Sequence, residues 1–221
     1  MLVTLVSAVA PAASFAQQSL SFSIGGFVPR GLASRDPNDQ ILDDSTYLAF
    51  RMSDFHGVTY GAEYLVGLGR WFDAGLGVSW YSQTVPTVYA NLVNADGSEI
   101  QQQLKLRTVP FTASFRLLPL GRSHAVQPYI GGGVAIINWK YSETGDFVDF
   151  SDGSIFTANY EGSGTATGPL FLVGATAPFG AWGLGGEIRY QHATGDLPSD
   201  FPSSKIDLGG WTYVATVHVR F

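Results

Sequence analysis

The chain has no cysteine and few charged residues, and both features exclude certain classes of protein and kinds of site. Without Cys, a disulfide, a thiolate metal site and a cysteine nucleophile are excluded. Charged residues make up only 14% of the 221 residues, fewer than the surface helices of a soluble protein use. The net charge is −6, so nucleic acid is not an expected partner, since phosphate binding requires a basic surface. No phosphate-binding loop or metalloprotease motif is present, and we expect no cofactor, no metal site and no catalytic residue.

Long apolar runs are also missing. A short run, 2–10, is followed by Pro11 and by Ser14 and Ala16 at the two positions that a signal peptidase inspects. Residues 1–16 are therefore predicted to be a signal peptide, and residues 17–221 the mature domain. No segment reaches the roughly 20 apolar residues of a transmembrane helix, so any membrane must be crossed by strands.

What the chain does contain is glycine, with 27 residues, and aromatic residues, at 14%. Segments of alternating apolar and polar residues recur eight times, each about the length of a tilted membrane-spanning strand: 18–28, 57–68, 72–82, 102–117, 127–141, 165–177, 182–192 and 208–221. Short connections alternate with long ones, which cover 29–56, 83–101, 142–164 and 193–207. The pattern predicts an all-β fold, an eight-stranded antiparallel up-and-down transmembrane β-barrel. Its short turns and both termini would be periplasmic and its long loops extracellular.

Charged and aromatic residues support this arrangement. Of the 18 acidic residues, 15 fall in the four long connections. Aromatic residues would form girdles at the two lipid interfaces, with Trp71 and Trp182 at the short-turn end, and with Trp80, Trp139, Tyr190 and Trp211 at the long-loop end. The alternative is a soluble exported β-sandwich or a lipocalin-like barrel, in which the same aromatic residues would fill a core.

The alternation also predicts which side chains face the barrel interior. Five charged residues fall on the face opposite the apolar one: Glu63, Arg116, Glu187, Arg189 and Arg220. An eight-stranded barrel encloses a lumen just wide enough for side chains. These charges would either pair with one another and plug the barrel, or form a gate or polar path for a solute. The segment 129–139 is apolar on both faces, so its orientation is not predicted.

Four segments resemble the small eight-stranded outer-membrane barrels of the OmpA, OmpW and opacity-protein type. They are Gln127-Pro-Tyr-Ile-Gly-Gly-Gly133, Gly185-Gly-Glu-Ile-Arg-Tyr190, Lys205-Ile-Asp-Leu-Gly-Gly-Trp211 and the terminal Val217-His-Val-Arg-Phe221. The resemblance implies a bacterial outer-membrane location with outer-membrane lipid and lipopolysaccharide as partners. It also implies that the last strand, ending at Phe221, is the signal read by the barrel-assembly machinery. No peptidoglycan-binding domain follows Phe221, so anchoring through such a domain is not expected.

The resemblance covers several functions, and the sequence favours a non-enzymatic envelope or surface protein that passes small solutes. Small hydrophobic solutes, as in OmpW-like proteins, would enter through apolar residues of the first two loops: 47–50, Val85, Val88, Tyr89 and Leu92. The alternative is a surface-binding or adhesion protein that acts through its loops and has a plugged barrel.

Two weaker patterns are also present. His192 is followed by Ala and Thr194, which faintly resembles the catalytic segment of lipid A deacylases and gives a remote enzymatic alternative. The third long connection carries Glu143, Asp146, Asp149 and Asp152. We expect these acids to form a solvated surface, with at most weak contact to the divalent ions around lipopolysaccharide.

Overall fold

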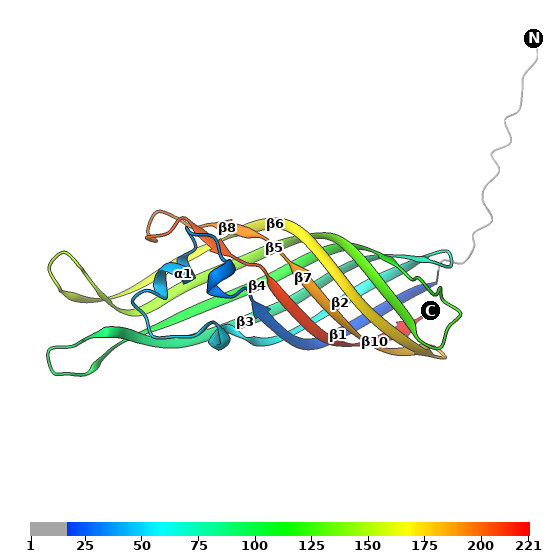
Figure 1. Ribbon diagram of the computed structural model, residues 1–221, viewed down its shortest axis with the longest axis horizontal. Helices are drawn as coiled ribbons and strands as arrows, with labels where there is room; N and C mark the ends of the chain where they lie inside the picture. Colours follow the sequence, from blue (N-terminus) through cyan, green and yellow to red (C-terminus); the bar gives the residue numbers. More distant parts are fainter. Residues whose placement is uncertain (1–16) are drawn as a thin grey trace, which may run out of the picture.

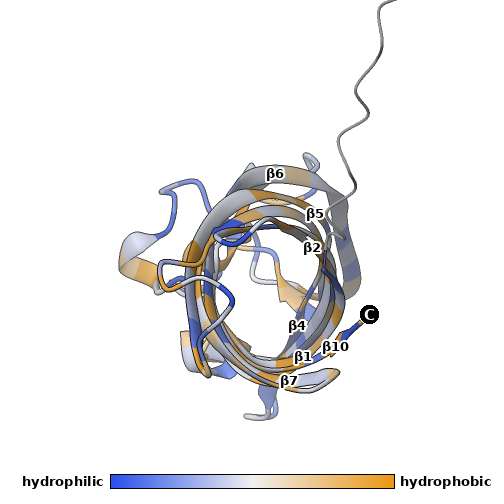
Figure 2. Cartoon of the chain, turned by 90° about the vertical axis from the view of Figure 1, so that its right-hand side faces the viewer, coloured by the Kyte–Doolittle hydropathy of each residue, from blue (hydrophilic) through white to orange (hydrophobic). Residues whose placement is uncertain are grey.

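The computed structural model describes residues 17–221, and the predicted signal peptide lies outside the described residues. Eight strands form a closed antiparallel barrel, which Figure 1 shows from the side and Figure 2 along its length. They are β1 (Gln18–Pro29), β2 (Gly57–Leu68), β3 (Phe72–Val93), β4 (Glu99–Leu117), β5 (Gln127–Val148), β6 (Ile155–Phe179), β7 (Trp182–Gln191) and β10 (Gly210–Arg220). Each strand pairs with its neighbour in the chain, and β1 pairs with β10 to close the ring. The predicted fold is confirmed.

An apolar band surrounds the barrel, because successive side chains alternate between the lumen and the outside. Outward residues include Tyr60 on β2, Phe111 on β4 and Leu184 on β7, each about half exposed. The band ends at one level, where the outward residues become polar: between Trp80 and Ser82, Val109 and Arg107, Ile136 and Asn138, and Pro169 and Thr167. This change marks the edge of the membrane-spanning part at the end opposite the C-terminus. Within residues 17–221, no helix is long and apolar enough to cross a membrane.

The second and third long connections are mostly strand, which corrects the prediction of loops at 83–101 and 142–164. Two hairpins, β3–β4 and β5–β6, project past the band at the end opposite the C-terminus (Figure 1). Their turns are only 94–98 and 149–154. The reason is that the extensions reverse the pattern: the outward face is polar above the lipid, and the inward face carries apolar residues such as Val85 and Leu104. A prediction that requires an apolar outward face therefore ends these strands at the membrane edge and assigns their extensions to loops.

The first and fourth connections fold over the mouth between these hairpins. The first carries the short helical turns η1 (Leu32–Ser34), α1 (Gln40–Asp44) and η2 (Met52–Phe55), and the fourth carries the strands β8 (Thr194–Asp196) and β9 (Lys205–Asp207), which pair. Asp39 caps α1 by accepting a hydrogen bond from the amide of Leu42 at 3.0 Å. Both connections contribute side chains to a buried cluster that closes the mouth.

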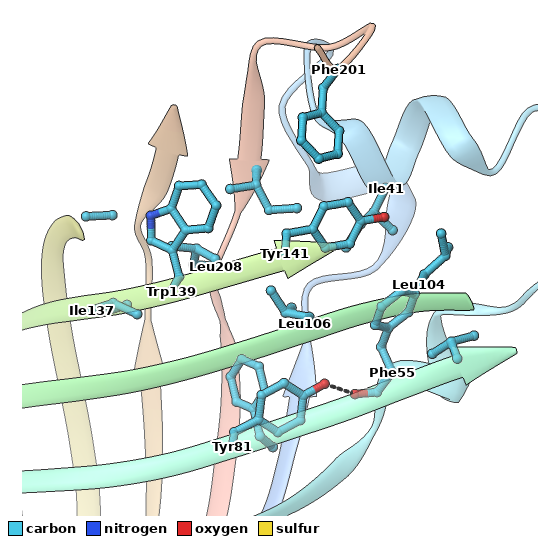
Figure 3. Close-up of a cluster of buried hydrophobic side chains, with 14 of the residues drawn as sticks. Ile41, Phe55, Tyr81, Leu104, Leu106, Ile137, Trp139, Tyr141, Phe201 and Leu208 are labelled. Atoms are coloured by element: carbon cyan, nitrogen blue, oxygen red, sulfur yellow. Dashed lines mark hydrogen bonds between the residues drawn. The ribbon is translucent and has the colours of Figure 1, made fainter. Parts of the chain in front are cut away.

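We call this cluster the apolar plug (Figure 3). It includes Ile41, Phe55, Tyr81, Leu104, Leu106, Ile137, Trp139, Tyr141, Phe201 and Leu208. Ile41 and Phe55 come from the first connection and are fully buried. The Tyr81 hydroxyl donates a hydrogen bond to the carbonyl of Phe55 (Figure 3), which fixes the first connection to the barrel wall. The plug therefore ties the two connections to three strands of the wall, β3, β4 and β5.

Aromatic residues lie at both edges of the apolar band, with one exception. Trp71 and Trp182 are exposed at one end, Trp80 and Trp211 at the other, and Tyr190 packs on Trp211 with ring centroids 4.8 Å apart. Trp139 is not part of a girdle: it is 4% exposed and lies in the apolar plug. Its strand is apolar on both faces, so the sequence alternation did not reveal that Trp139 points inward. The terminal Phe221 is 70% exposed.

A charge placed within the apolar band should cost far more than the same charge above it. Ala113 and Gln103 are both exposed outward residues of β4, within and above the band. We expect Ala113→Arg to lower the free energy of unfolding by about 2–4 kcal/mol and Gln103→Arg by at most about 1 kcal/mol. Urea titration of the barrel in lipid vesicles measures both, and equal losses would show that the band is misplaced.

Candidate functional site

Four of the five predicted interior charges meet in one network across the lumen. Glu63 comes from β2, Arg116 from β4, and Glu187 and Arg189 from β7. Arg116 pairs with both carboxylates, at 2.9 Å from Glu187, and Arg189 also pairs with both, at 3.1 Å from Glu63. Two positive and two negative charges thus compensate one another, as buried charges require. Of the two alternatives for these residues, the structure supports pairing.

Two further residues complete the network: Ser114, which the alternation of its strand places inward, and Tyr129, which the sequence analysis missed. The Tyr129 hydroxyl donates to Glu187 at 2.8 Å, and the Ser114 hydroxyl donates to Glu63 at 3.0 Å. The Arg116 guanidinium lies 4.6 Å from the centre of the Tyr129 ring, within the range of a cation–π contact. Tyr129 could not be found from the pattern, because it belongs to the segment with two apolar faces.

The fifth interior charge, Arg220, lies apart from the network. It donates to Gln127 at 3.4 Å and, with His218, lines a cavity of only about 40 Å³. The glycines beside the network do not open a path there either, because side chains fill the space next to Gly75 and Gly77. A Cβ on Gly75 would lie 2.5 Å from a carboxylate oxygen of Glu63. The described lumen is therefore filled by the network in the membrane-spanning part and by the apolar plug above it.

A second polar group lies at the mouth, above the apolar band, where α1 meets β5. Asp44 accepts hydrogen bonds from Tyr141 and Gln40, both at 2.8 Å. Glu143 is 5% exposed, and its Oε1 has no hydrogen-bond partner. Within residues 17–221 neither carboxyl forms an ion pair. We call Asp44 and Glu143 the acid pair.

Burial and mutual repulsion make the acid pair hard to ionise. Burial raises the pKa of Asp44, and burial together with the neighbouring Asp44 carboxylate raises the pKa of Glu143 to about 9. Because two negative charges at this place would repel each other in a buried environment, the pair favours holding a proton. The expectation that Glu143 belongs to a solvated acidic surface is therefore wrong, since β5 continues far enough to turn its side chain inward. Asp149 and Asp152 do lie in an exposed turn, where they accept hydrogen bonds from Ser151 and Ser154.

The residues proposed for an entrance do not gather at one site but are divided among four places. Tyr47 and Tyr89 line a cavity of about 190 Å³ beside the acid pair, whereas Val85 is buried in the hydrophobic cluster that closes the mouth. Val88 borders a separate hollow beneath the β3–β4 hairpin. Leu92 is exposed near the turn of that hairpin.

Ionic contacts hold the first and fourth connections together. Arg35 pairs with Asp39 at 2.6 Å and donates to the carbonyl of Asp207 at 2.9 Å. Arg30 lies 2.9 Å from the Asp207 carboxylate and 2.8 Å from Nδ1 of His192. His192 thus contacts a guanidinium, and no hydrogen bond joins it to Thr194 among the described residues. This group fastens the loops rather than forming a nucleophile–base pair.

Solved structures share this fold. OprG from Pseudomonas aeruginosa is 12% identical, with 93% of this chain and 96% of that chain covered and a TM-score of 0.54. Neisserial surface protein A is 12% identical, with coverage of 93% and 97% and a TM-score of 0.50. No protein-family model and no curated protein matches the sequence. The chain therefore has the fold of the small eight-stranded outer-membrane β-barrel proteins, as the sequence predicts.

Removing one charge from the lumen network should destabilise the barrel strongly. We expect Glu187→Gln to lower the free energy of unfolding by about 3–5 kcal/mol, because it leaves two arginines with one carboxylate. The matched control is Glu161→Gln, which breaks the exposed Lys140–Glu161 pair and should cost at most about 1 kcal/mol. Urea unfolding in vesicles measures both variants. A loss of less than 1 kcal/mol in Glu187→Gln would show that water, not pairing, satisfies the network.

The acid pair should make stability fall as pH rises. Its raised pKa means that the folded state holds a proton that the unfolded state loses near pH 4–5, so this stabilising contribution disappears as pH approaches 9. Between about pH 5 and pH 8, wild type should lose up to about 1.4 kcal/mol per pH unit relative to Glu143→Gln. Unfolding titrations at several pH values test this, with Asp152→Asn expected to follow wild type. A wild-type-to-Glu143→Gln difference that stays constant with pH would contradict the assignment.

Proposed function

We propose that the protein is a non-enzymatic surface protein of the bacterial outer membrane whose barrel does not form an open aqueous pore. The observation that carries this proposal is the double closure of the lumen by the charge network and the apolar plug. The active part of the molecule is then its projecting outer end. Neisserial surface protein A, which has the same fold, is a surface protein by its name.

In the proposed orientation, both termini are periplasmic and the extended hairpins stand in the extracellular space. Support comes from the unequal ends of the barrel, with short turns beside the termini and long hairpins opposite them. Outward Arg107 and Lys105 lie just above the band, and the Arg107 guanidinium is 5.1 Å from the Trp80 ring. Basic residues at this level suit the phosphates of lipopolysaccharide. Insertion by the barrel-assembly machinery through the strand that ends at Phe221 is part of the same proposal.

Passage of small hydrophobic solutes is the second candidate. The cavity beside Tyr47 and Tyr89 favours it, because most of its lining residues are aromatic or aliphatic and it lies at the mouth. A solute leaving this cavity for the lumen would meet Tyr141 and Leu104, both fully buried in the apolar plug. Binding at the outer end is therefore better supported than conduction. A lipid A deacylase activity has little support, since His192 contacts Arg30.

Planar-bilayer recording tests the closed barrel. Refolded protein covering residues 17–221 should be electrically silent, because the network and the plug seal the lumen in series. Glu187→Gln should be silent too, since the plug remains. Folding is verified by resistance of the barrel to heat in detergent. Discrete openings in wild type, with a conductance that changes in Glu187→Gln, would overturn the proposal and establish a pore lined by the network.

A further inference from the structure

The cavity at the mouth is built from aromatic rings around the acid pair. Tyr47 packs on Tyr89 and Phe150, with ring centroids 6.2 and 6.0 Å apart. Phe147 packs on Phe156 and Tyr160, at 6.0 and 4.9 Å. All six rings line the same cavity. Phe150 is 69% exposed, so the cavity reaches the outer surface. We call this site the aromatic pocket.

The charged residues that line the aromatic pocket are all acidic. Glu143 lines it, as does Asp200 from the fourth connection, and none of its lining residues is basic. The unpartnered Oε1 of Glu143 belongs to a side chain that is 95% buried, since 5% of its surface is exposed. A buried acceptor without a donor is costly, and this one lies at a cavity that a ligand can enter. A ligand that supplies positive charge would remove that cost.

Ring faces and carboxylates attract the same kind of ligand. The face of an aromatic ring carries negative charge density and binds ammonium groups, especially methylated ones. The cavity volume of about 190 Å³ is below the range of roughly 300–1,000 Å³ typical of sites for drug-sized molecules. We propose that the aromatic pocket binds a small organic cation of the alkylammonium class, with its methyl groups against the rings and the acid pair as counter-charge. This inference rests on the proposal that the outer end is the functional surface.

Binding would compete with the proton that the acid pair holds. The titratable groups around Glu143 are all acids or phenols: Asp43 and Asp44 from the α1 region, Asp200 from the fourth connection, and Tyr47, Tyr89, Tyr141 and Tyr160. A bound cation displaces the proton of the pair, and proton release accompanies binding. Affinity for the cation should therefore rise with pH, at the pH values where the empty pair becomes less stable.

Choline and its uncharged isostere 3,3-dimethyl-1-butanol separate charge recognition from simple apolar binding. Calorimetric titration uses the full barrel in non-ionic maltoside micelles, because amine-oxide or phosphocholine detergents carry competing headgroups. We expect choline to bind at least tenfold more tightly than the alcohol, with affinity rising between pH 6 and pH 8.5. Equal binding of the two compounds, or no binding of choline at millimolar concentration, would overturn the inference.

Variants locate the site. Glu143→Gln should weaken choline binding roughly tenfold or more, because the charge-assisted contact is lost, and should leave the alcohol unaffected. Asp152→Asn removes a carboxylate from the nearby exposed turn and should bind choline like wild type. Phe150→Ala changes an exposed ring and should weaken both compounds, which keeps the test open if Glu143→Gln does not fold. Choline binding unchanged in both Glu143→Gln and Phe150→Ala would refute the site.

Failure of this inference is distinguishable from failure of the proposed function. A barrel that is silent in the bilayer but does not discriminate choline from the alcohol refutes the cation site alone. A conducting barrel refutes the closed lumen. The calorimetric titration still decides separately whether the aromatic pocket binds a cation.

Discussion

Pairing of β1 with β10 closes the sheet, and this closure sets the conditions for every other part of the molecule. It leaves no strand edge facing lipid, where each unpaired backbone group would cost several kcal/mol. It also limits the lumen to the width of side chains. Inward residues must then satisfy one another, which Glu63, Arg116, Glu187 and Arg189 do by sharing their charges. The charge network across the lumen is thus a consequence of eight-strand closure combined with this particular set of charges.

Above the membrane the polarity of the two faces of the barrel wall is reversed. Its outer face is polar because water surrounds it, and its inner face is apolar because two surface connections cover the opening. The outer end is therefore organised like a small water-soluble β-protein, with its own core, built on strands that continue from the membrane part. The contact between Tyr81 and Phe55 and the ionic contacts of Arg35 show how the connections are held to this core.

The sequence alone was sufficient to predict the strands and their inward residues where one face of a strand met lipid. The segments predicted at 57–68 and 18–28 match β2 and β1 within one residue at their ends, and four interior charges were found because they broke an apolar alternation. It was insufficient where the two faces of a strand do not differ in polarity, or where the polar face is the outward one. Trp139 and Tyr129 lie in a strand with two apolar faces, and Glu143 lies above the band, where polar residues face outward on strands as they do in loops. The acid pair joins residues 99 positions apart, which no local pattern reveals.

The lumen network and the acid pair solve the same physical problem differently. In the lumen, two carboxylates are neutralised by two guanidiniums supplied by the fold, and that solution is permanent. At the mouth, two carboxyls face each other without a cation among the described residues, and they must take up a proton or a ligand to be neutralised. A proton and the proposed cation would act on the same pair, which contacts the apolar plug through Tyr141 and the aromatic pocket through Glu143. The fold therefore places its ion-paired charges inside the membrane-spanning part and its unpaired carboxyls at the mouth, above the apolar band.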